Sequence, residues 1–213
     1  MTGAGAAMRR VFATRERHTL EPAQEDALAG LAARVRELTE AVVLTDVESA
    51  EVAEVAEEVA KLTARLSAVR HAAPPIARLD GHGLVHQLAS PVSGRLNPIA
   101  PPVEMKAQPD GSVRCEFTLS VVYEGPPGFV HGGVSALILD QLLGSAAAAN
   151  GTPGMTATLD LRYRRPTPHG VPLTAEARTV RVDGRKTYVD AVIFGPDGKP
   201  TVEATAMFIL PQR

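Results

Sequence analysis

Residues 131–144 read HGGVSALILDQLLG, a run of small and apolar residues that contains one carboxylate, Asp140. Such a run is typical of a buried helix. An unpaired carboxylate in an apolar interior costs several kcal/mol or shifts its pKa upward, so we expect Asp140 to have a chemical role. The alternative is an aspartate on the wet stripe of an amphipathic helix. Its neighbours at helical spacing are all apolar: Ala136, Leu137, Leu143 and Gly144.

The segment before this helix, residues 123–133 (YEGPPGFVHGG), is rich in glycine and proline and indicates a fixed loop. Gly132 and Gly133 have no side chain to block a ligand, and their N–H groups fall at the helix N-terminus. Unpaired donors and the positive end of the helix dipole favour a developing negative charge there. With a carboxylate about two turns further on, the pattern predicts an oxyanion hole that faces a base or a nucleophile.

At these residues the chain resembles the hotdog-fold acyl-CoA thioesterases, in particular their phenylacetate-pathway-like branch, which has His-Gly-Gly followed by an acidic residue on the central helix. The resemblance covers about residues 100–213 and includes the stretch LRYRRPTP at 161–168. It implies that the Gly132 N–H polarises a thioester carbonyl and that Asp140 activates water or attacks directly. It also implies an acyl-CoA substrate, no separate cofactor, and a homodimer or a tetramer.

Two further family positions match this chain less well. Some relatives hold the water with an asparagine six residues before the motif histidine, where this chain has Gly125, next to Glu124. Some relatives have a serine on the strand after the helix, and Thr156 matches it with a hydroxyl that could bond to the carboxylate or to water. Alternation along the strand places Thr156 with Thr158 and Asp160 on the more polar face, so a solvent-exposed threonine is an equal alternative.

Other candidates for the site are weaker. His131 could be a general base, but a role in shaping the loop is favoured. Candidates for substrate contact are Gly133, Glu124 and Asn97. For Asn97 the alternative is a turn-forming role. A basic set could clamp the phosphates of coenzyme A or could be an ordinary solvated surface; it consists of Arg162, Arg164 and Arg165, with Arg185 and Lys186. His71, His82 and His86 lack partners at ligand spacing, so we expect no metal site.

Composition narrows the class of protein. The 22 basic and 24 acidic residues nearly cancel, which argues against binding to nucleic acid or to a membrane surface. Cys115 is the single cysteine, so there is no intrachain disulfide framework, and we expect a cytoplasmic protein. The first residues lack the apolar core of a signal peptide, and no apolar run approaches the eighteen or so residues of a membrane span.

The N-terminal part, residues 1–80, is expected to be a helical extension. Apolar residues mark one helical face from Leu28 to Val42 and another from Val52 to Val69, which predicts a helical hairpin over about 23–70. Thr45 and Glu48 have capping-box spacing, so the second helix should begin near Asp46. Residues 81–102 are rich in proline and glycine and are predicted to be an irregular connection.

The remaining residues, 103–213, are expected to form the hotdog domain. Strands are predicted at 103–107, 113–121, 155–164, 172–182, 185–194 and 201–210. Turn signals stand at Asp183-Gly184 and at 196–199. Antiparallel strands with one apolar face, wrapped around one long apolar helix, make an α+β hotdog fold with an N-terminal helical hairpin. Periodicity does not give the strand order.

Three functions are compatible with this pattern. The first is hydrolysis of an acyl-CoA thioester, the second is an enoyl-CoA hydratase or dehydratase, and the third is a non-catalytic acyl-CoA sensor. The hydratase-type Asp-x-x-x-x-His spacing is absent around His131. Sensors of this fold carry a DNA-binding unit, whereas residues 1–80 have a net charge of −3 from ten basic and thirteen acidic residues. Because nine residues of helix separate His131 from Asp140 by about 13 Å, we expect the site to be shared with a two-fold mate.

Overall fold

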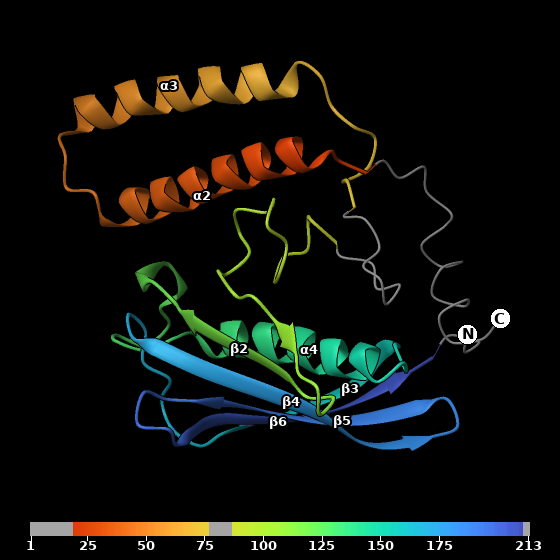
Figure 1. Ribbon diagram of the computed structural model, residues 1–213. Helices are drawn as coiled ribbons and strands as arrows, with labels where there is room; N and C mark the ends of the chain where they lie inside the picture. Colours follow the sequence, from red (N-terminus) through yellow and green to blue (C-terminus); the bar gives the residue numbers. More distant parts are fainter. Residues whose placement is uncertain (1–18, 77–86, 211–213) are drawn as a thin grey trace.

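The computed structural model describes residues 19–76 and 87–210. Six strands form one antiparallel sheet in the order β1-β2-β4-β5-β6-β3, and the long helix α4 (Gly132–Ala149) lies against one face of it (Figure 1). The strands are β1 (Lys106–Ala107), β2 (Val113–Thr118), β3 (Met155–Tyr163), β4 (Pro172–Asp183), β5 (Lys186–Phe194) and β6 (Pro200–Ile209). The expected α+β hotdog fold is confirmed, and the structure supplies the strand order.

The core of this hotdog body lies between α4 and the inner face of the sheet. One face of α4 is fully enclosed; it consists of Ser135, Ile138, Leu139, Leu142, Leu143, Ala146 and Ala147. Alternate residues of β5 and β6, such as Val189 and Phe208, complete the core. By length and composition the 18 residues of α4 could cross a membrane, which corrects the expectation that no run approaches that length. Here α4 is the core helix of the body.

The opposite face of α4 is not buried in the single chain. Asp140 is half-buried, and Leu137 on the same face has 39% of its surface exposed. The expectation of a buried helix is therefore met on one face of α4, whereas the face that carries Asp140 is open in one protomer. The stripe is apolar but open to solvent, and apolar stripes of this kind commonly mark interfaces.

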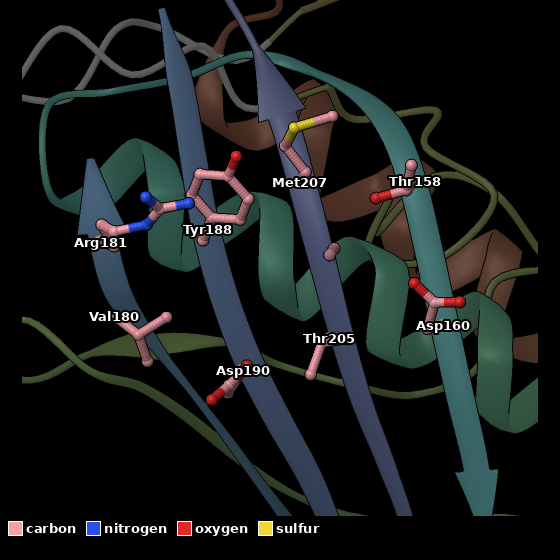
Figure 2. A pocket seen from close by; sticks show the side chains of 9 residues that line it. Thr158, Asp160, Val180, Arg181, Tyr188, Asp190, Thr205 and Met207 are labelled. Atoms are coloured by element: carbon pink, nitrogen blue, oxygen red, sulfur yellow. The ribbon is translucent and has the colours of Figure 1, made fainter. Parts of the chain in front are cut away.

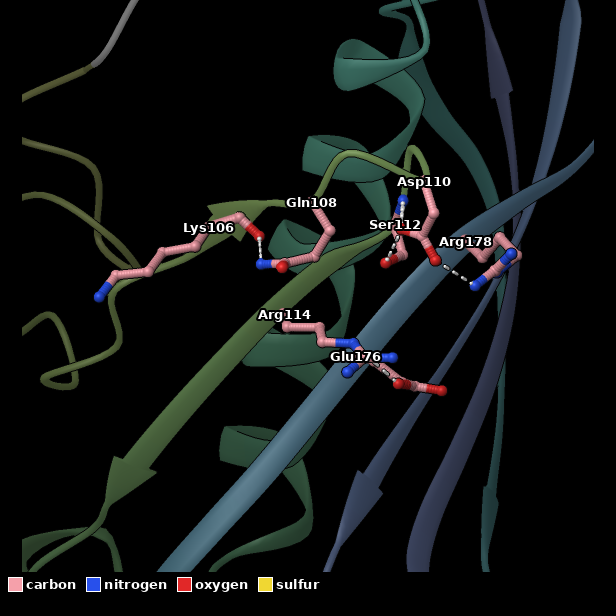
Figure 3. A network of polar contacts seen from close by, with 7 residues as sticks. All are labelled: Lys106, Gln108, Asp110, Ser112, Arg114, Glu176 and Arg178. Carbon is pink, nitrogen blue, oxygen red and sulfur yellow. Dashed lines mark hydrogen bonds and ion pairs between the residues drawn. The ribbon is translucent and has the colours of Figure 1, made fainter.

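The turn from β1 to β2 is fastened by a carboxylate (Figure 3). Asp110 accepts hydrogen bonds from the Ser112 hydroxyl at 2.6 Å and the Ser112 N–H at 3.0 Å, and it pairs with Arg178 of β4 at 2.8 Å. The Ser112 bonds, aided by Arg178, lower the pKa of Asp110 to about 2. Gly111 in this turn has φ +80°, a value that favours glycine.

Two strands are shorter than expected. β1 spans only Lys106–Ala107, and β2 ends at Thr118 rather than at Val121. The Ser120 hydroxyl accepts a hydrogen bond from the Val122 N–H and begins a 3₁₀ helix, η1 (Val121–Tyr123). The apolar alternation continues past the point where this local cap takes the backbone out of the sheet.

A bulge in β3 changes which side chains face α4. Thr156 pairs with Phe208 and Thr158 pairs with Met207, so Ala157 is an extra residue in the ladder. Directly paired residues lie on the same side of a sheet, and Phe208 is buried against α4. Thr156 therefore faces the helix, whereas Thr158 and Asp160 lie on the outer face (Figure 2). The expected grouping of Thr156 with Thr158 and Asp160 is wrong because an inserted residue reverses the alternation.

The N-terminal hairpin consists of α2 (Pro22–Leu44) and α3 (Ser49–Ser67), which run beside each other above the body (Figure 1). The second helix begins at Ser49 rather than near Asp46, because the Thr45 hydroxyl accepts a hydrogen bond from the Val47 N–H and forms a turn instead of a helix cap.

Helix α2 is fastened to the body. It packs near η1, the Arg36 guanidinium donates to the Asn97 carbonyl at 3.2 Å, and Arg95 pairs with Glu25 and Asp26 at 2.8 and 3.1 Å. In α3 no residue is buried.

Candidate active site

The N-terminus of α4 keeps one backbone donor available. The His131 Nδ1 accepts a hydrogen bond from the Gly133 N–H at 3.0 Å, and the His131 carbonyl accepts from the Val134 and Ser135 N–H groups. Among the described residues no acceptor takes the Gly132 N–H. The first turn of a helix carries partial positive charge, so this N–H is the donor that an oxyanion would find there.

His131 is a cap in this structure. The lone pair of its Nδ1 already accepts a hydrogen bond from a backbone N–H, so the neutral ring carries its hydrogen on Nε2. No free ring lone pair is then left to act as a general base. This geometry agrees with the loop-shaping role that the sequence favours over a general base.

Gly125 packs directly against the motif histidine. A Cβ at Gly125 would lie 2.8 Å from the His131 Cα and 3.1 Å from its Cβ, which is closer than real Cβ contacts. An asparagine therefore does not fit at this position with His131 where it is. The departure from the water-holding asparagine of some relatives has a steric cause in this chain.

Glu124 fastens the same loop. Its Oε1 accepts from the Gly128 N–H at 2.6 Å and lies 3.1 Å from the His169 Nε2. These contacts, the Gly128 bond first, lower the pKa of the carboxyl below its usual range. One carboxylate oxygen of this substrate-contact candidate is thus already engaged in holding the loop.

Among the described residues Asp140 has one polar partner, on an otherwise apolar helix face. The Thr156 hydroxyl, brought inward by the β3 bulge, donates to the Asp140 Oδ1 at 2.9 Å. The hydrogen bond that the sequence left open is present. It fixes one carboxylate oxygen and leaves the other, on a half-exposed stripe, accessible to a water molecule or to an electrophile.

Tyr163 is a residue that the sequence analysis did not select. At the far end of β3 its hydroxyl donates to the Gly132 carbonyl at 2.9 Å, and its ring lies so close that a Cβ on Gly132 would meet it at 3.3 Å. The available signal was its place on the inward face of the strand at 155–164. β3 thus contacts both candidate positions of α4, Asp140 through Thr156 and Gly132 through Tyr163.

The remaining candidates lie elsewhere or are already paired. Arg164 pairs with Glu203 at 2.8 Å, and Arg165 pairs with Asp197 at 2.9 Å, so an anion clamp would have to compete with these carboxylates. In the part of the chain that the structure describes, Arg162 forms no ion pair.

Asn97 has the turn-forming role that was its alternative. Its side-chain oxygen accepts from the Ile99 N–H at 3.1 Å, and its amide donates to the Ala89 carbonyl at 3.1 Å.

No metal-binding group of three His, Cys, Asp or Glu side chains occurs within residues 19–76 and 87–210. His82 and His86 lie outside the described residues. A hollow of about 510 Å³ opens on the outer face of the sheet near Tyr188 and Asp190 (Figure 2). The sheet separates this hollow from α4, so it is distinct from the candidate site.

Comparison with known proteins gives a consistent picture. Residues 127–202, which include the α4 motif and β3, match a family model described as thioesterase superfamily. The chain is 35% identical to the acyl-coenzyme A thioesterase THEM4 of Xenopus laevis over 96 residues, which cover 45% of this chain and 43% of that protein. It is 39% identical to THEM4 of Mus musculus over 87 residues, covering 40% and 37%. The chain thus spans about two fifths of the length of these curated relatives.

Among solved structures, a crystal structure of a thioesterase superfamily protein is 40% identical, with a TM-score of 0.77 over 85% of this chain and 94% of that one. Zebrafish thioesterase superfamily member 2 is 20% identical, with a TM-score of 0.51 over 58% and 91%, and shares the fold.

Proposed function

The chain belongs to the thioesterase superfamily, and we propose on that premise that it hydrolyses acyl-CoA thioesters to the free acid and coenzyme A. The observation that carries this proposal is the Asp140 carboxylate, held by Thr156 on an otherwise apolar, half-exposed helix face. The sequence relatives named acyl-coenzyme A thioesterase support the choice of substrate class.

In the proposed reaction, Asp140 accepts a proton from water while the water oxygen bonds to the thioester carbonyl carbon. The Gly132 N–H stabilises the oxyanion that forms. The carbon–sulfur bond then breaks, and the coenzyme A sulfur leaves and is protonated. In the covalent variant, the Asp140 oxygen bonds to the carbonyl carbon, the carbon–sulfur bond breaks and the coenzyme A thiolate leaves. Water then hydrolyses the mixed anhydride, which releases the free acid and restores the Asp140 carboxylate.

The site is proposed to be shared between two protomers. Gly132 and Asp140 of one chain are eight residues apart on α4, about 12 Å along the helix axis, which is too far for both to act on one carbonyl. Two features support a second copy at this place. Among the described strands, β3 lies at the edge of the sheet and pairs with β6 alone, and the α4 stripe beside it is apolar and open to solvent. A two-fold axis along this edge would bring Gly132 of one chain to Asp140 of its mate.

Release of free thiol from a panel of thioesters tests the activity. Acetyl-CoA through palmitoyl-CoA and phenylacetyl-CoA are the substrates, and we expect turnover of at least one of them. The non-catalytic acyl-CoA sensor is the second candidate, favoured only if acyl-CoA binds and no thiol is released from any of them. Hydration of an enoyl-CoA without thiol release would support the hydratase instead.

Subunit mixing tests the shared site. Gly132→Pro removes the N–H at a position where the helix tolerates proline. Gly132→Ala is the matched control, because its Cβ meets the Tyr163 ring as the proline Cβ does but the N–H is kept. After Gly132→Pro and Asp140→Ala chains are refolded together, about half of the dimers are mixed and each has one intact site, so roughly a quarter of the parent activity returns. Mixed dimers as inactive as either variant would place the whole site within one chain.

A further inference from the structure

Helix α3 carries an apolar seam that stays exposed beside the rest of the described chain. Apolar residues recur along it at alternating intervals of three and four, and they are Val52, Val55, Val59, Leu62 and Leu66. This is the period of a coiled-coil seam, in which each residue fits between four residues of a facing helix. The exposed fractions of these side chains run from 37% at Val59 to 60% at Leu66.

The neighbouring helix α2 does not cover the apolar seam of α3. α2 has a single buried residue, Ala32, and the face that carries Arg36 is fastened to the body. Its own apolar residues Leu28 and Leu31 remain about 40% and 39% exposed. The hairpin thus presents an open apolar stripe, and a contiguous stripe of this kind commonly marks an interaction site.

The charges on α3 are divided along its length. The first half is acidic and contains Glu51, Glu54, Glu57 and Glu58; the second half is basic and contains Lys61 and Arg65. A parallel copy would place like charges together, whereas an antiparallel copy places acidic residues opposite basic ones. The helix is therefore complementary in charge to a second copy of itself in the antiparallel orientation.

We propose that α3 pairs antiparallel with α3 of a second copy of this chain. The seam sets the register, because antiparallel coiled coils place the two kinds of seam position opposite each other. Val59 then packs against Leu62 of the second copy, and Val55 packs against Leu66. Glu58 and Arg65 flank the seam and face each other across it, twice by symmetry. Neither side chain has an ion-pair partner among the described residues of its own chain.

Distances between labelled copies test this arrangement in the full-length chain. Spin labels are placed at Lys61→Cys, near the two-fold axis, and in a separate protein at Glu51→Cys, near the helix end. With a rise of 1.5 Å per residue and helix axes 8–10 Å apart, the two copies of position 61 should lie about 10 Å apart and those of position 51 about 30 Å apart. The native Cys115 is buried, which raises the pKa of its thiol to about 12 and keeps it from being labelled at neutral pH.

Charge reversal provides the second arm. Glu58→Arg or Arg65→Glu alone puts like charges opposite each other and should lower the ratio of the near to the distant population at position 61 by roughly 3- to 30-fold. The two changes together restore opposite charges and should restore the ratio. Glu57→Arg is the matched control, because its position points away from the seam, and should leave the ratio unchanged.

Three results would overturn the proposal. Equally short distances at positions 61 and 51 would mean a parallel pair. The absence of a short distance between copies of position 61 in solution would rule out the α3 pair. If phosphatidylcholine vesicles then slow the motion of the spin label at that position, a membrane is the occupant. Loss of the near population in both single variants without recovery in the double variant would show that the charges do not set the register.

Discussion

The hotdog body and the N-terminal hairpin show the same hydrophobic pattern in the sequence but differ in how far the structure buries it. Both contain helices with long apolar stripes. In the body, Leu139 and Leu142 of α4 are completely enclosed by the sheet, whereas in the hairpin Leu62 and Leu66 of α3 are 50% and 60% exposed. An apolar stripe thus predicts that a partner exists, but does not say whether the partner is in the same chain.

The two regions should differ most in how far a substitution lowers catalytic turnover. Asp140→Asn keeps the shape of the side chain and removes its capacity to accept a proton, so kcat should fall by roughly 10² to 10⁴ while the thermal unfolding midpoint stays close to that of the parent. Steady-state thiol release measures it. Asp160→Asn, on the outer face of the same sheet, is the control and should keep full activity. Turnover of the Asp140 variant within threefold of the parent would remove Asp140 from the mechanism.

Stability should separate the regions next. Leu142→Ala leaves a cavity between α4 and the sheet and should lower the free energy of unfolding of the body by about 2–5 kcal/mol. Leu66→Ala in α3 should change it by less than about 0.5 kcal/mol, because that side chain does not touch the body. Hydrogen exchange of the β5 amides in both variants measures the difference. Equal losses would mean that hairpin and body unfold as one unit.

The hydroxyl next to Asp140 should have a smaller effect. Thr156→Val keeps the size of the side chain and removes the hydrogen bond to the carboxylate, which is worth about 1.5–3 kcal/mol when one partner is charged. We expect kcat to fall by roughly 10- to 100-fold. Thr156→Ser retains the hydroxyl and should recover most of the activity. If Val and Ser behave alike, the hydrogen bond in the structure has no part in the reaction.

Hydrophobic periodicity predicted most of the helices and strands of the body, because each of them has one solvent-exposed and one buried face. The turns at Asp183-Gly184 and 196–199 were visible for a related reason, since Gly184 and Gly198 adopt φ values of +57° and +72° that favour glycine. The β3 bulge had no such mark. Ala157 is an unremarkable residue, and its insertion is determined by the pairing with β6, so alternation alone placed Thr156 on the wrong face.

The site was only partly predictable for the same reason. Gly132 and Asp140 belong to a local motif and are evident within fourteen residues. Tyr163 acts on Gly132 from 31 positions away, and nothing in its own neighbourhood indicates which carbonyl its hydroxyl reaches. The open α4 stripe likewise depends on what the rest of the sheet leaves uncovered.

Tyr163 gives the next smaller prediction. Tyr163→Phe keeps the ring against Gly132 and removes the hydrogen bond to its carbonyl, a neutral bond worth about 0.5–1.5 kcal/mol. The first turn of α4 should hold its N–H less firmly, so kcat should fall by roughly 2- to 10-fold with little change in KM. Tyr188→Phe on the outer face of the sheet is the control. An unchanged kcat in the Tyr163 variant would mean that the helix start is already fixed by His131.

Removal of the hairpin should have the smallest effect on the reaction, and it tests the comparison most directly. A chain that begins at Gln87 loses α2 and α3 but keeps Leu88 and Val92, which are 4% and 5% exposed. It also keeps the turn in which the Leu96 N–H donates to the Leu88 carbonyl at 3.0 Å. The lost contacts include the exposed pairs of Arg95 with Glu25 and Asp26, and surface pairs of this kind contribute about 0–1 kcal/mol each. The shortened chain should therefore fold and release thiol from a short acyl-CoA with kcat within about threefold of the parent, because neither Asp140 nor Gly132 contacts the hairpin.

A folded but inactive chain would show that α2 or α3 supplies part of the site, and the division between a chemical body and an associating hairpin would have to be abandoned.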